Sequence, residues 1–512
     1  MGNSPSRLPL ASQIGSPLQI CLNNVFAGKS SAVSYPQDFL YQLLDVKAYN
    51  THIPIVPAAV TRPSTPDEIS EILRCATESG VKVQARSGGH SYGNYGLGGE
   101  DNAVVVDMGN FQRFSMDFVT WQATIGAGTL LGDVTTRLRD AGGRAIAHGT
   151  CPQVGISGHA TIGGLGPLSR QWGAALDHVI EVEVVLANGT VTRANSTYNS
   201  DVLWAIKGAA ASFGIVTEFV FVTHPEPSSV VQYSYTIELG SHSDMWPTFA
   251  LWQEIVADPA LDRQLASEVI VLPRSMIITA TYFGTREEYA ALNFEQRLAK
   301  NARNVVAISN DSWLSLVANW AETGALKLIG GLPNAFYAKS LTFTNTTLIP
   351  QAGIQDFFSH LDTADAGTLF WFAVFDLQGG ATNDVPHDAT AFAHRDTLFY
   401  LQAYAFSLTK LSDTSIAFVE GMIDTITYAM PGVDFGAYTG YVDPHLPDGQ
   451  AKYWKTNLPR LQQIKAAIDP NDLFHNPQSV PVGGTQSESP LLDSVISNPL
   501  GACCTLLNLN TP

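Results

Sequence analysis

The sequence predicts an α+β protein built as two lobes, and three observations carry that prediction. The chain has 512 residues, which is more than one hydrophobic core usually serves. Helical and strand-like patterns alternate irregularly up to residue 225, with glycine-rich connections between them. From residue 226 to 445 strictly alternating strands dominate, beginning with Val231, Tyr233 and Tyr235, as is typical of an antiparallel sheet with helices on one face.

The first lobe starts without a clear pattern, and residues 1–50 are expected to be irregular. At Thr65-Pro66-Asp67-Glu68 a capping box with proline at the first helical position predicts a helix, which ends at Gly80. The patterns then predict strands over 81–86, 103–108, 122–127, 179–186, 190–193 and 214–222, and helices over 130–138 and 203–206. The Asn188-Gly189 pair between two of these strands predicts a hairpin.

The second lobe is predicted to hold strands over 231–239, 277–283, 369–376 and 398–406, with helices over 247–257 and 414–428. A last amphipathic helix carries Leu458, Leu461, Ile464 and Ile468 and stops at Asp469-Pro470. Residues 474–482 are expected to return to the first lobe. The predicted boundaries are therefore 1–225 for the first domain, 226–445 for the second, 446–482 for the return and 483–512 for a mobile tail.

Composition and charge narrow the class of partner. The net charge of -18 repels nucleic-acid phosphates and anionic lipid, so we expect no nucleic-acid partner and a neutral small-molecule substrate. No apolar run reaches the roughly 18–20 residues of a membrane helix, and Met1 to Pro9 contain no hydrophobic signal core. N-glycosylation triplets begin at Asn188, Asn195, Asn310 and Asn345. A monomer is expected, and no His/Cys/Asp spacing predicts a metal site.

Two glycine-rich loops are the strongest local signals. The first, Arg86-Ser87-Gly88-Gly89-His90-Ser91-Tyr92, follows a predicted strand, so its N–H groups can converge on a phosphate. The second runs from Gly149 to Gly166, and its many glycines let backbone lie against a flat ligand without Cβ clashes. Neither loop has the spacing of a Rossmann fingerprint or of a GxxxxGK[ST] phosphate loop.

These loops, together with Asp469-Pro470-Asn471-Asp472-Leu473-Phe474 and Asn476-Pro477-Gln478-Ser479-Val480-Pro481, resemble the berberine-bridge-enzyme-like flavoproteins of the vanillyl-alcohol-oxidase group. The resemblance covers roughly residues 20 to 482. It implies a two-part FAD-binding domain and a substrate domain. It also implies covalent FAD, with His90 joined to the 8α carbon and Cys151 to C6 of the flavin. A neutral imidazole and a thiolate are suitable nucleophiles for these bonds.

The cofactor-binding residues that the resemblance implies come from both loops, a strand and the returning segment. They are Arg86, Ser87, Gly88, Gly89, His90, Ser91, Tyr92, Gly149, Thr150, Cys151, Gly155, Gly158, His159, Gly163, Gly164, Ile215, Val216, Asn476 and Gln478. His159 and its neighbour His148 are interpreted as residues that hydrogen-bond the second loop or lie near the flavin. A similar cysteine pair in the family implies a Cys21–Cys75 disulfide and hence secretion. Because no signal peptide is visible, an intracellular location stays open.

Within the family the chain is most similar to the fungal oligosaccharide oxidases. Tyr438-Thr439-Gly440-Tyr441 resembles their base-bearing segment, and Phe375-Asp376-Leu377-Gln378 resembles the strand that carries the supporting carboxylate. Tyr441 would be the base and Asp376 its supporter. The implied reaction takes the anomeric hydroxyl of a mono- or oligosaccharide to a lactone by hydride transfer to FAD. An ordinary tyrosine pKa near 10 is high for a base, and a nearby carboxylate raises it further.

Other interpretations stay open. Residues 166–170 and the sheet around 268–281 depart from the oligosaccharide oxidases, which favours an alkaloid, alcohol or amine oxidoreductase of secondary metabolism as the alternative. A flavin-binding protein without turnover is a third reading, and the electron acceptor can be oxygen or another compound. The aromatic residues Trp371, Phe372, Phe336 and Tyr337 either stack on sugar rings or pack the core of the sheet.

Overall fold

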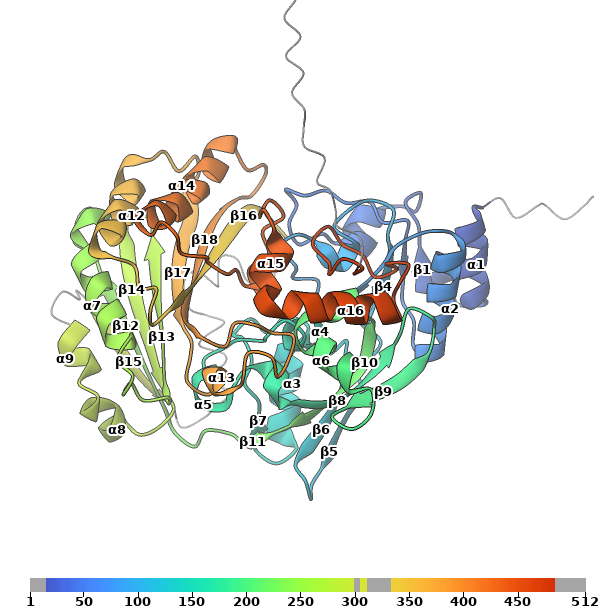
Figure 1. Ribbon diagram of the computed structural model, residues 1–512, viewed down its shortest axis with the longest axis horizontal. Helices are drawn as coiled ribbons and strands as arrows, with labels where there is room; N and C mark the ends of the chain where they lie inside the picture. The colour runs from blue at the N-terminus through green and yellow to red at the C-terminus, as the bar shows by residue number, and fades with distance from the viewer. Residues whose placement is uncertain (1–14, 299–303, 311–332, 484–512) are drawn as a thin grey trace, which may run out of the picture.

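The computed structural model describes residues 15–298, 304–310 and 333–483 (Figure 1). It has the predicted α+β architecture, with a large antiparallel sheet in one half of the molecule and smaller sheets in the other. All the strands predicted above are present, with ends shifted by at most two residues. None of the helices in the described part of the chain is long and apolar enough to cross a membrane.

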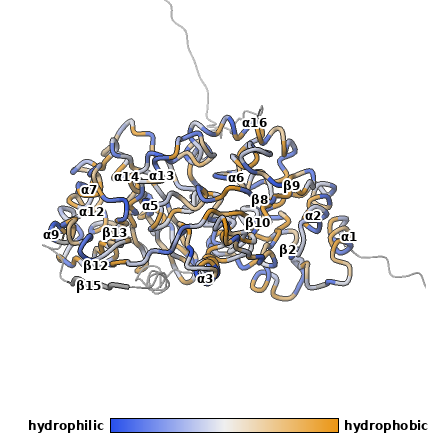
Figure 2. Tube along the Cα trace, turned by 90° about the horizontal axis from the view of Figure 1, so that it is seen from below, coloured by the Kyte–Doolittle hydropathy of each residue, from blue (hydrophilic) through white to orange (hydrophobic). Residues whose placement is uncertain are grey.

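The first half contains a mainly parallel sheet and an antiparallel one. The four-stranded sheet has the order β1 (Val33–Ser34), β2 (Ala59–Thr61), β4 (Val104–Asp107) and β3 (Val83–Arg86). The five-stranded sheet has the order β5 (Phe114–Asp117), β6 (Gln122–Gly126), β10 (Ile215–Val222), β8 (Val179–Val185) and β9 (Val191–Asn195). β8 and β9 form the predicted hairpin, and Gly189 supplies its positive φ of 82°. Figure 2 shows β8 and β10 inside this half, with α1 at its outer end.

Short helices and one small ribbon connect these sheets. They are α3 (Leu131–Asp140), α4 (Ile156–Ala160), α5 (Ser169–Trp172), α6 (Ser200–Ala209), β7 (Arg144–Ala145) and β11 (His224–Pro225). α3 and α6 were predicted, and both extend beyond their predicted limits. The longest helix here is α2 (Pro66–Glu78), capped by Thr65, whose hydroxyl accepts the N–H of Glu68 as the capping box predicts.

The expectation that residues 1–50 are irregular cannot be compared with structure at residues 1–14, which lie outside the described residues, and it is wrong for α1, β1 and the helical turns that follow α1. α1 (Pro17–Val25) begins at Ser16, which forms a full capping box with Gln19, and a π-helical turn spans Gln42–Val46. The signal for α1 was a serine cap followed by proline at the first position, the same signal that marks α2. α1 packs on α2, and the Cys21–Cys75 disulfide joins them, as the resemblance implied.

The second half is built on a seven-stranded sheet whose paired strands are all antiparallel. Its order is β15 (Asn304–Asn310), β12 (Val230–Ile237), β14 (Ser275–Tyr282), β13 (Leu265–Leu272), β17 (Phe370–Leu377), β18 (Thr397–Ser407) and β16 (Ala335–Thr344). The helices of this half are α7 (Trp246–Val256), α8 (Arg286–Ala291), α9 (Phe294–Leu298), α12 (Gln351–Thr363), α13 (Ala381–Asp384) and α14 (Asp413–Ala429). The strands β13, β15 and β16 and the helix α12 were not predicted.

One face of this sheet is covered and the other faces the first half. α7, α12 and α14 lie against the outer face (Figure 1), where Phe249, Phe358 and Phe375 pack in one apolar core. Because side chains alternate along a strand, Asp376 and Val374 point to the opposite face from Phe375. That opposite face is free to line a site between the halves.

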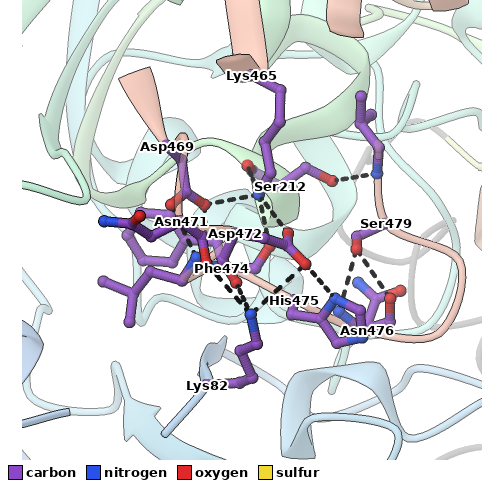
Figure 3. Close-up of polar contacts among 12 residues, drawn as sticks. Lys82, Ser212, Lys465, Asp469, Asn471, Asp472, Phe474, His475, Asn476 and Ser479 are labelled. Atoms are coloured by element: carbon purple, nitrogen blue, oxygen red, sulfur yellow. Dashed lines mark hydrogen bonds and ion pairs between the residues drawn. The ribbon is translucent and has the colours of Figure 1, made fainter. Parts of the chain in front are cut away.

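The C-terminal segment returns to the first half, as predicted. α15 (Gly449–Trp454) and α16 (Leu458–Ile468) lead to it, and Val83 N–H donates to the carbonyl of Leu473 at 2.9 Å. Figure 3 shows the lock that holds the return: the buried Lys465 ammonium donates to the Asp469 carboxylate at 2.6 Å and to the Phe474 carbonyl at 2.9 Å. It also donates to the Ser212 carbonyl at 2.8 Å, so one cation joins the return to the segment before β10.

Candidate active site

A cavity of about 680 Å³ lies between the two halves. Both glycine-rich loops line it, and the inner face of the seven-stranded sheet lines it from the opposite side. Most of the predicted site residues are on its surface: the whole of 86–92, then Gly149, Thr150, Cys151, Gly155, Gly158, His159, Asp376, Tyr441, Asn476 and Gln478. The sequence therefore placed both catalytic candidates and both candidate tethers in one cavity.

Four predicted residues lie outside this lining. Ile215 and Val216 line a small adjoining cavity of about 80 Å³, together with Ser87 and Gly158. Gly163 and Gly164 line neither cavity. Their role is close packing: a Cβ on Gly164 would lie 2.4 Å from the Cβ of Ala175, and both glycines have positive φ.

The two glycine-rich loops touch backbone to backbone beside the cavity. A Cβ on Gly88 would lie 2.3 Å from the amide nitrogen of Gly155, and a Cβ on Gly155 would lie 2.1 Å from Ser87 Oγ. Ser87 Oγ in turn donates to the carbonyl of Ala127 at 2.7 Å. No side chain fits between these segments, so the two glycines bring both loops to the same wall of the cavity.

Several predicted cofactor residues act as anchors of that wall. The Arg86 guanidinium pairs with Asp107 at 2.5 Å and also donates to the carbonyls of Asp45 and Val46, so it holds the start of the first loop in place. His159 Nε2 accepts the N–H of Gly149 at 2.9 Å, as expected of a histidine that holds the second loop. Burial lowers the pKa of His159 to about 3, which keeps this acceptor nitrogen free of a proton.

The returning segment closes one end of the cavity. Gln478 accepts hydrogen bonds from the hydroxyls of Tyr95 at 2.9 Å and Tyr453 at 3.1 Å, and it donates to the carbonyl of Asp443 at 2.8 Å. The Asn476 side chain accepts the N–H of Gln478 at 3.0 Å. The amide of Gln478 thus joins the first half, the returning segment and the loop that carries Tyr441.

His90 and Cys151 both lie on the cavity wall, and burial makes both neutral. It lowers the pKa of His90 to about 4, and the ring of Tyr49 lies 4.6 Å from the imidazole, centroid to centroid. It raises the pKa of the free Cys151 thiol to about 11. The imidazole is therefore the neutral nucleophile expected, whereas the expected thiolate is not the resting form, and this thiol must lose a proton before it can form a bond.

Tyr441 and Asp376 approach the cavity from different elements. Tyr441 ends the short helix η8 (Thr439–Tyr441), and its ring stacks on Tyr92 at 5.9 Å and meets Tyr438 edge-on at 5.2 Å. Burial, and next the charge of Asp376, raise the pKa of Tyr441 well above 10. Tyr441 therefore holds its own proton at rest and can accept another only by passing one on.

Glu268 is a site residue that the sequence analysis did not assign. It lies on β13 directly opposite Asp376 of β17, and both line the cavity. Burial raises the pKa of Glu268 to about 7. Burial and the charge of Glu268 raise the pKa of Asp376 well above its usual range, although Gln378 donates to Asp376 at 2.7 Å. No strand was predicted over β13, whose residues do not alternate, and the pairing of Glu268 with residue 376 needs the register of two distant strands.

The floor of the cavity carries a group of polar side chains among apolar ones. Gln232, Ser234, Glu268, Thr279, Thr281, Asp376 and Gln402 line it from five neighbouring strands. Gln402 also donates to the hydroxyl of Tyr92 at 2.8 Å. Of the four aromatic candidates for sugar stacking, only Phe372 lines the cavity; Trp371 and Tyr337 belong to the core under the helices, and Phe336 packs among Tyr49, Tyr92 and Tyr404.

This arrangement suits a flavin nucleotide. Flat backbone, two neutral nucleophiles and a volume within the range of about 300–1,000 Å³ common for ligand sites lie together. In the described ranges no group of three His, Cys, Asp or Glu side chains could hold a metal ion.

Comparison with known proteins gives the same picture. The model of the FAD binding domain family matches residues 57–195, and that of the berberine and berberine-like family matches residues 437–481. FAD-linked oxidoreductase sorD of Penicillium rubens is 39% identical over 473 residues, covering 92% of this chain and 99% of that protein.

Two solved structures share the fold throughout. The xylooligosaccharide oxidase from Myceliophthora thermophila, in complex with xylobiose, has a TM-score of 0.82 and 31% identity over 91% of this chain and 99% of its own. Glucooligosaccharide oxidase from Acremonium strictum, described with a 6-S-cysteinyl, 8α-N1-histidyl FAD, has a TM-score of 0.81 and 29% identity over the same shares of the two chains.

Proposed function

The chain belongs to the berberine-bridge-enzyme-like FAD-linked oxidoreductases, and from that premise we propose that it oxidises the anomeric hydroxyl of a mono- or oligosaccharide to a lactone. The observation that carries this proposal is the group of polar side chains on the cavity floor, which line the same cavity as the two tether residues. Amide, hydroxyl and carboxyl groups such as those of Gln232, Thr281 and Glu268 suit a substrate that carries many hydroxyls. Relatives named as oxidases of xylo-, chito- and glucooligosaccharides support the substrate class.

His90 and Cys151 are the proposed covalent attachments of FAD, at the 8α carbon and at C6. Their position on one cavity wall supports this, and so does the cysteinyl and histidyl linkage named for the glucooligosaccharide oxidase. FAD, when bound, supplies the acceptor for the hydride that leaves the substrate carbon. The contacts of Gly88 with Gly155 and of Gln478 with Tyr453 hold the surrounding wall in place.

Tyr441 and Asp376 are the proposed acceptors of the hydroxyl proton. Because Tyr441 is protonated at rest, its oxygen takes the substrate proton as its own proton moves toward the carboxyl of Asp376. Asp376 suits this second role, since burial makes it a stronger base than an exposed carboxylate. Stacking on Tyr92 holds the Tyr441 ring in one orientation during the transfer.

Location and partners complete the proposal. The Cys21–Cys75 disulfide and the exposed sequon residues Asn188 and Asn345 support secretion into an oxidising compartment. The enzyme is proposed to act as a monomer, with oxygen or another small molecule as electron acceptor.

A second candidate is oxidation of a secondary metabolite, and one observation favours it. Ile270, Phe372 and Val374 form an apolar strip on the same cavity floor. Such a strip suits the flat hydrocarbon face of an aromatic or polyene alcohol better than a sugar hydroxyl. The similarity to sorD, whose name specifies no sugar, is compatible with this candidate.

A substrate panel tests both candidates. The purified holoenzyme is mixed without oxygen with xylobiose, cellobiose, chitobiose, glucose and a set of apolar allylic and benzylic alcohols, and the loss of flavin absorbance is followed. Bleaching by a saccharide, with the matching lactone detected by mass spectrometry, is the expected result. Bleaching by the apolar alcohols alone would replace the first candidate with the second. Parallel assays for hydrogen peroxide and for reduction of an artificial dye identify the acceptor.

A further inference from the structure

Glu268 and Asp376 stand as a pair at the floor of the cavity. They are directly opposed residues of the antiparallel strands β13 and β17, so their Cβ atoms lie about 4.5–5.5 Å apart on the same face. Both line the cavity. No Lys, Arg or His in the described part of the chain lowers the pKa of either carboxyl.

Two buried carboxylates at this separation do not both ionise readily. Each negative charge raises the cost of the other in a low-dielectric site, and no cation offsets either one here. Aspartic proteases respond to the same situation by sharing one proton between two carboxyl groups. The pair titrates as a unit, with two apparent pKa values that belong to both residues.

The groups that face the pair are neutral or weakly acidic. Thr279 lies opposite Glu268 on β14, and Tyr400 lies opposite Asp376 on β18. The Cys151 thiol is near enough to Glu268, and the Tyr438 phenol near enough to Asp376, for the carboxylate to raise the pKa of each. Tyr441 is affected by both carboxyls. The tyrosine that meets the substrate is thus coupled to both members of the pair.

We propose that Glu268 and Asp376 share one proton and together accept the proton that the substrate hydroxyl loses. This rests on the proposed function. The C–H hydrogen would leave with both bonding electrons as a hydride that FAD accepts, the O–H proton would pass through the Tyr441 hydroxyl to the pair, and the C–O bond of the substrate would become C=O. The pair changes from one proton to two, and it later returns one proton to solvent. Glu268 is therefore half of the acceptor, and Asp376 does not act alone.

Infrared spectroscopy of the resting holoenzyme tests the shared proton without turnover. The C=O stretching band of the buried carboxylic acid is followed as the pH rises. In Glu268→Gln the remaining carboxyl, that of Asp376, ionises beside a neutral neighbour. Its C=O band should therefore disappear at a pH at least one unit lower than the band of the wild type. Glu238→Gln, which changes an exposed carboxylate just beyond β12, is the control and should leave the band unchanged. An unchanged midpoint in Glu268→Gln would overturn the proposal.

Kinetics test the second half of the proposal. Glu268→Gln should lower kcat by about 10–100-fold with little change in KM, because a proton acceptor acts in the chemical step. Glu268→Asp, which keeps the carboxyl, should recover part of kcat. A rise in KM at constant kcat would show instead that Glu268 only binds substrate, and the shared acceptor would be wrong.

The two proposals fail in different ways. If the wild type bleaches with no saccharide, the proposed function fails, while the infrared midpoint still decides whether the proton is shared. If saccharides bleach the flavin and the midpoint does not move, the pair alone is refuted.

Discussion

The two walls of the cavity are built in opposite ways. The cofactor-side wall comes mainly from the two glycine-rich loops, whose backbones touch at Gly88 and Gly155. The substrate-side wall comes from single side chains on five strands, such as Gln232, Thr281 and Gln402. The residues of a loop wall follow one another in the sequence, so a short motif identifies them together. The residues of a sheet face are every second residue of several separate strands, so no short motif contains them. Similarity in the loops therefore identifies the cofactor more firmly than the substrate.

The charges of the two walls differ as well. Burial keeps the His90 imidazole and the Cys151 thiol neutral on the cofactor side. The substrate side holds Glu268 and Asp376, whose ionisation is opposed by burial and by one another.

Removal of both tethers should have the largest effect. The double variant His90→Ala/Cys151→Ala has neither nucleophile, so the denatured protein should lack the mass of FAD. Each single variant should keep that mass after denaturation, because the other covalent bond remains. Intact-mass spectrometry after denaturation measures this directly. Release of free FAD from the wild type by acid would contradict covalent attachment.

Loss of the Tyr441 hydroxyl should stop the substrate-side chemistry and leave the cofactor side intact. Tyr441→Phe keeps the ring that stacks on Tyr92, so we expect an unchanged flavin spectrum and a kcat lower by about 10²–10⁴-fold. Stopped-flow flavin reduction measures the step. Tyr428→Phe, at a tyrosine that is 79% exposed, is the matched control. A Tyr441→Phe enzyme with full kcat would assign the proton to another group.

Sequence reasoning identified the two glycine-rich loops of the cofactor-side wall, but it did not identify three other residues of the cavity lining, Tyr49, Gly208 and Trp454. Loop 86–92 and residues 149–159 are contiguous, so a short motif specifies both the chemistry and the place. Sequence reasoning could not give the direction or the exact position of single residues in these loops. The Arg86 guanidinium points to Asp107, and Gly163 packs against Phe392 and Tyr438 and does not reach the cavity. A motif shows that a residue is near a site without showing which way its side chain points.

Only part of the substrate-side wall could be predicted from the sequence. Alternation in β12 and β17 gave those strands and the face of Asp376, but β13, β15 and β16 were missed. Glu268 could not be assigned because it is more than 100 positions from its partner and only the β13–β17 register brings the two together. The short helix α1 was missed for a different reason. Its Ser16 cap is visible in the sequence, but its apolar pattern covers too few turns to distinguish it from a loop.

The Lys465 lock should show how far the returning segment supports the cofactor side. Lys465→Met leaves the buried carboxylate of Asp469 without its cation, which should cost about 3–5 kcal/mol of unfolding free energy. Denaturant unfolding measures it. Lys452→Met, which breaks the exposed pair with Asp434, should cost under about 1 kcal/mol. Equal effects of the two variants would contradict a buried lock.

Arg170 joins the two walls of the cavity, and its substitution should lower kcat moderately. Its buried guanidinium donates to the carbonyls of Leu265 at 2.8 Å and Gln378 at 2.5 Å, close in sequence to Glu268 and Asp376. Arg170→Lys keeps the charge and loses the fork, so both strands shift and kcat should fall by about tenfold. Flavin reduction rates measure this, with Arg263→Lys on the exposed pair with Asp384 as control. A changed KM with constant kcat would place Arg170 in substrate binding.

The smallest expected effect is a dependence of the unfolding free energy on pH, caused by the buried carboxyl groups of the substrate-side wall. Burial raises the pKa of Glu268 from 4.5 to about 7 and that of its partner Asp376 well above 3.8, so the folded pair binds protons that the unfolded chain releases. Stability therefore falls as the pH rises through that window, by about 1–3 kcal/mol. Glu268→Gln removes the ionisation, so the variant should lose less stability than the wild type between pH 4.5 and 7. Unfolding in guanidinium at several pH values measures the difference, and parallel curves for both proteins would show that Glu268 ionises as freely in the folded state as in the unfolded chain.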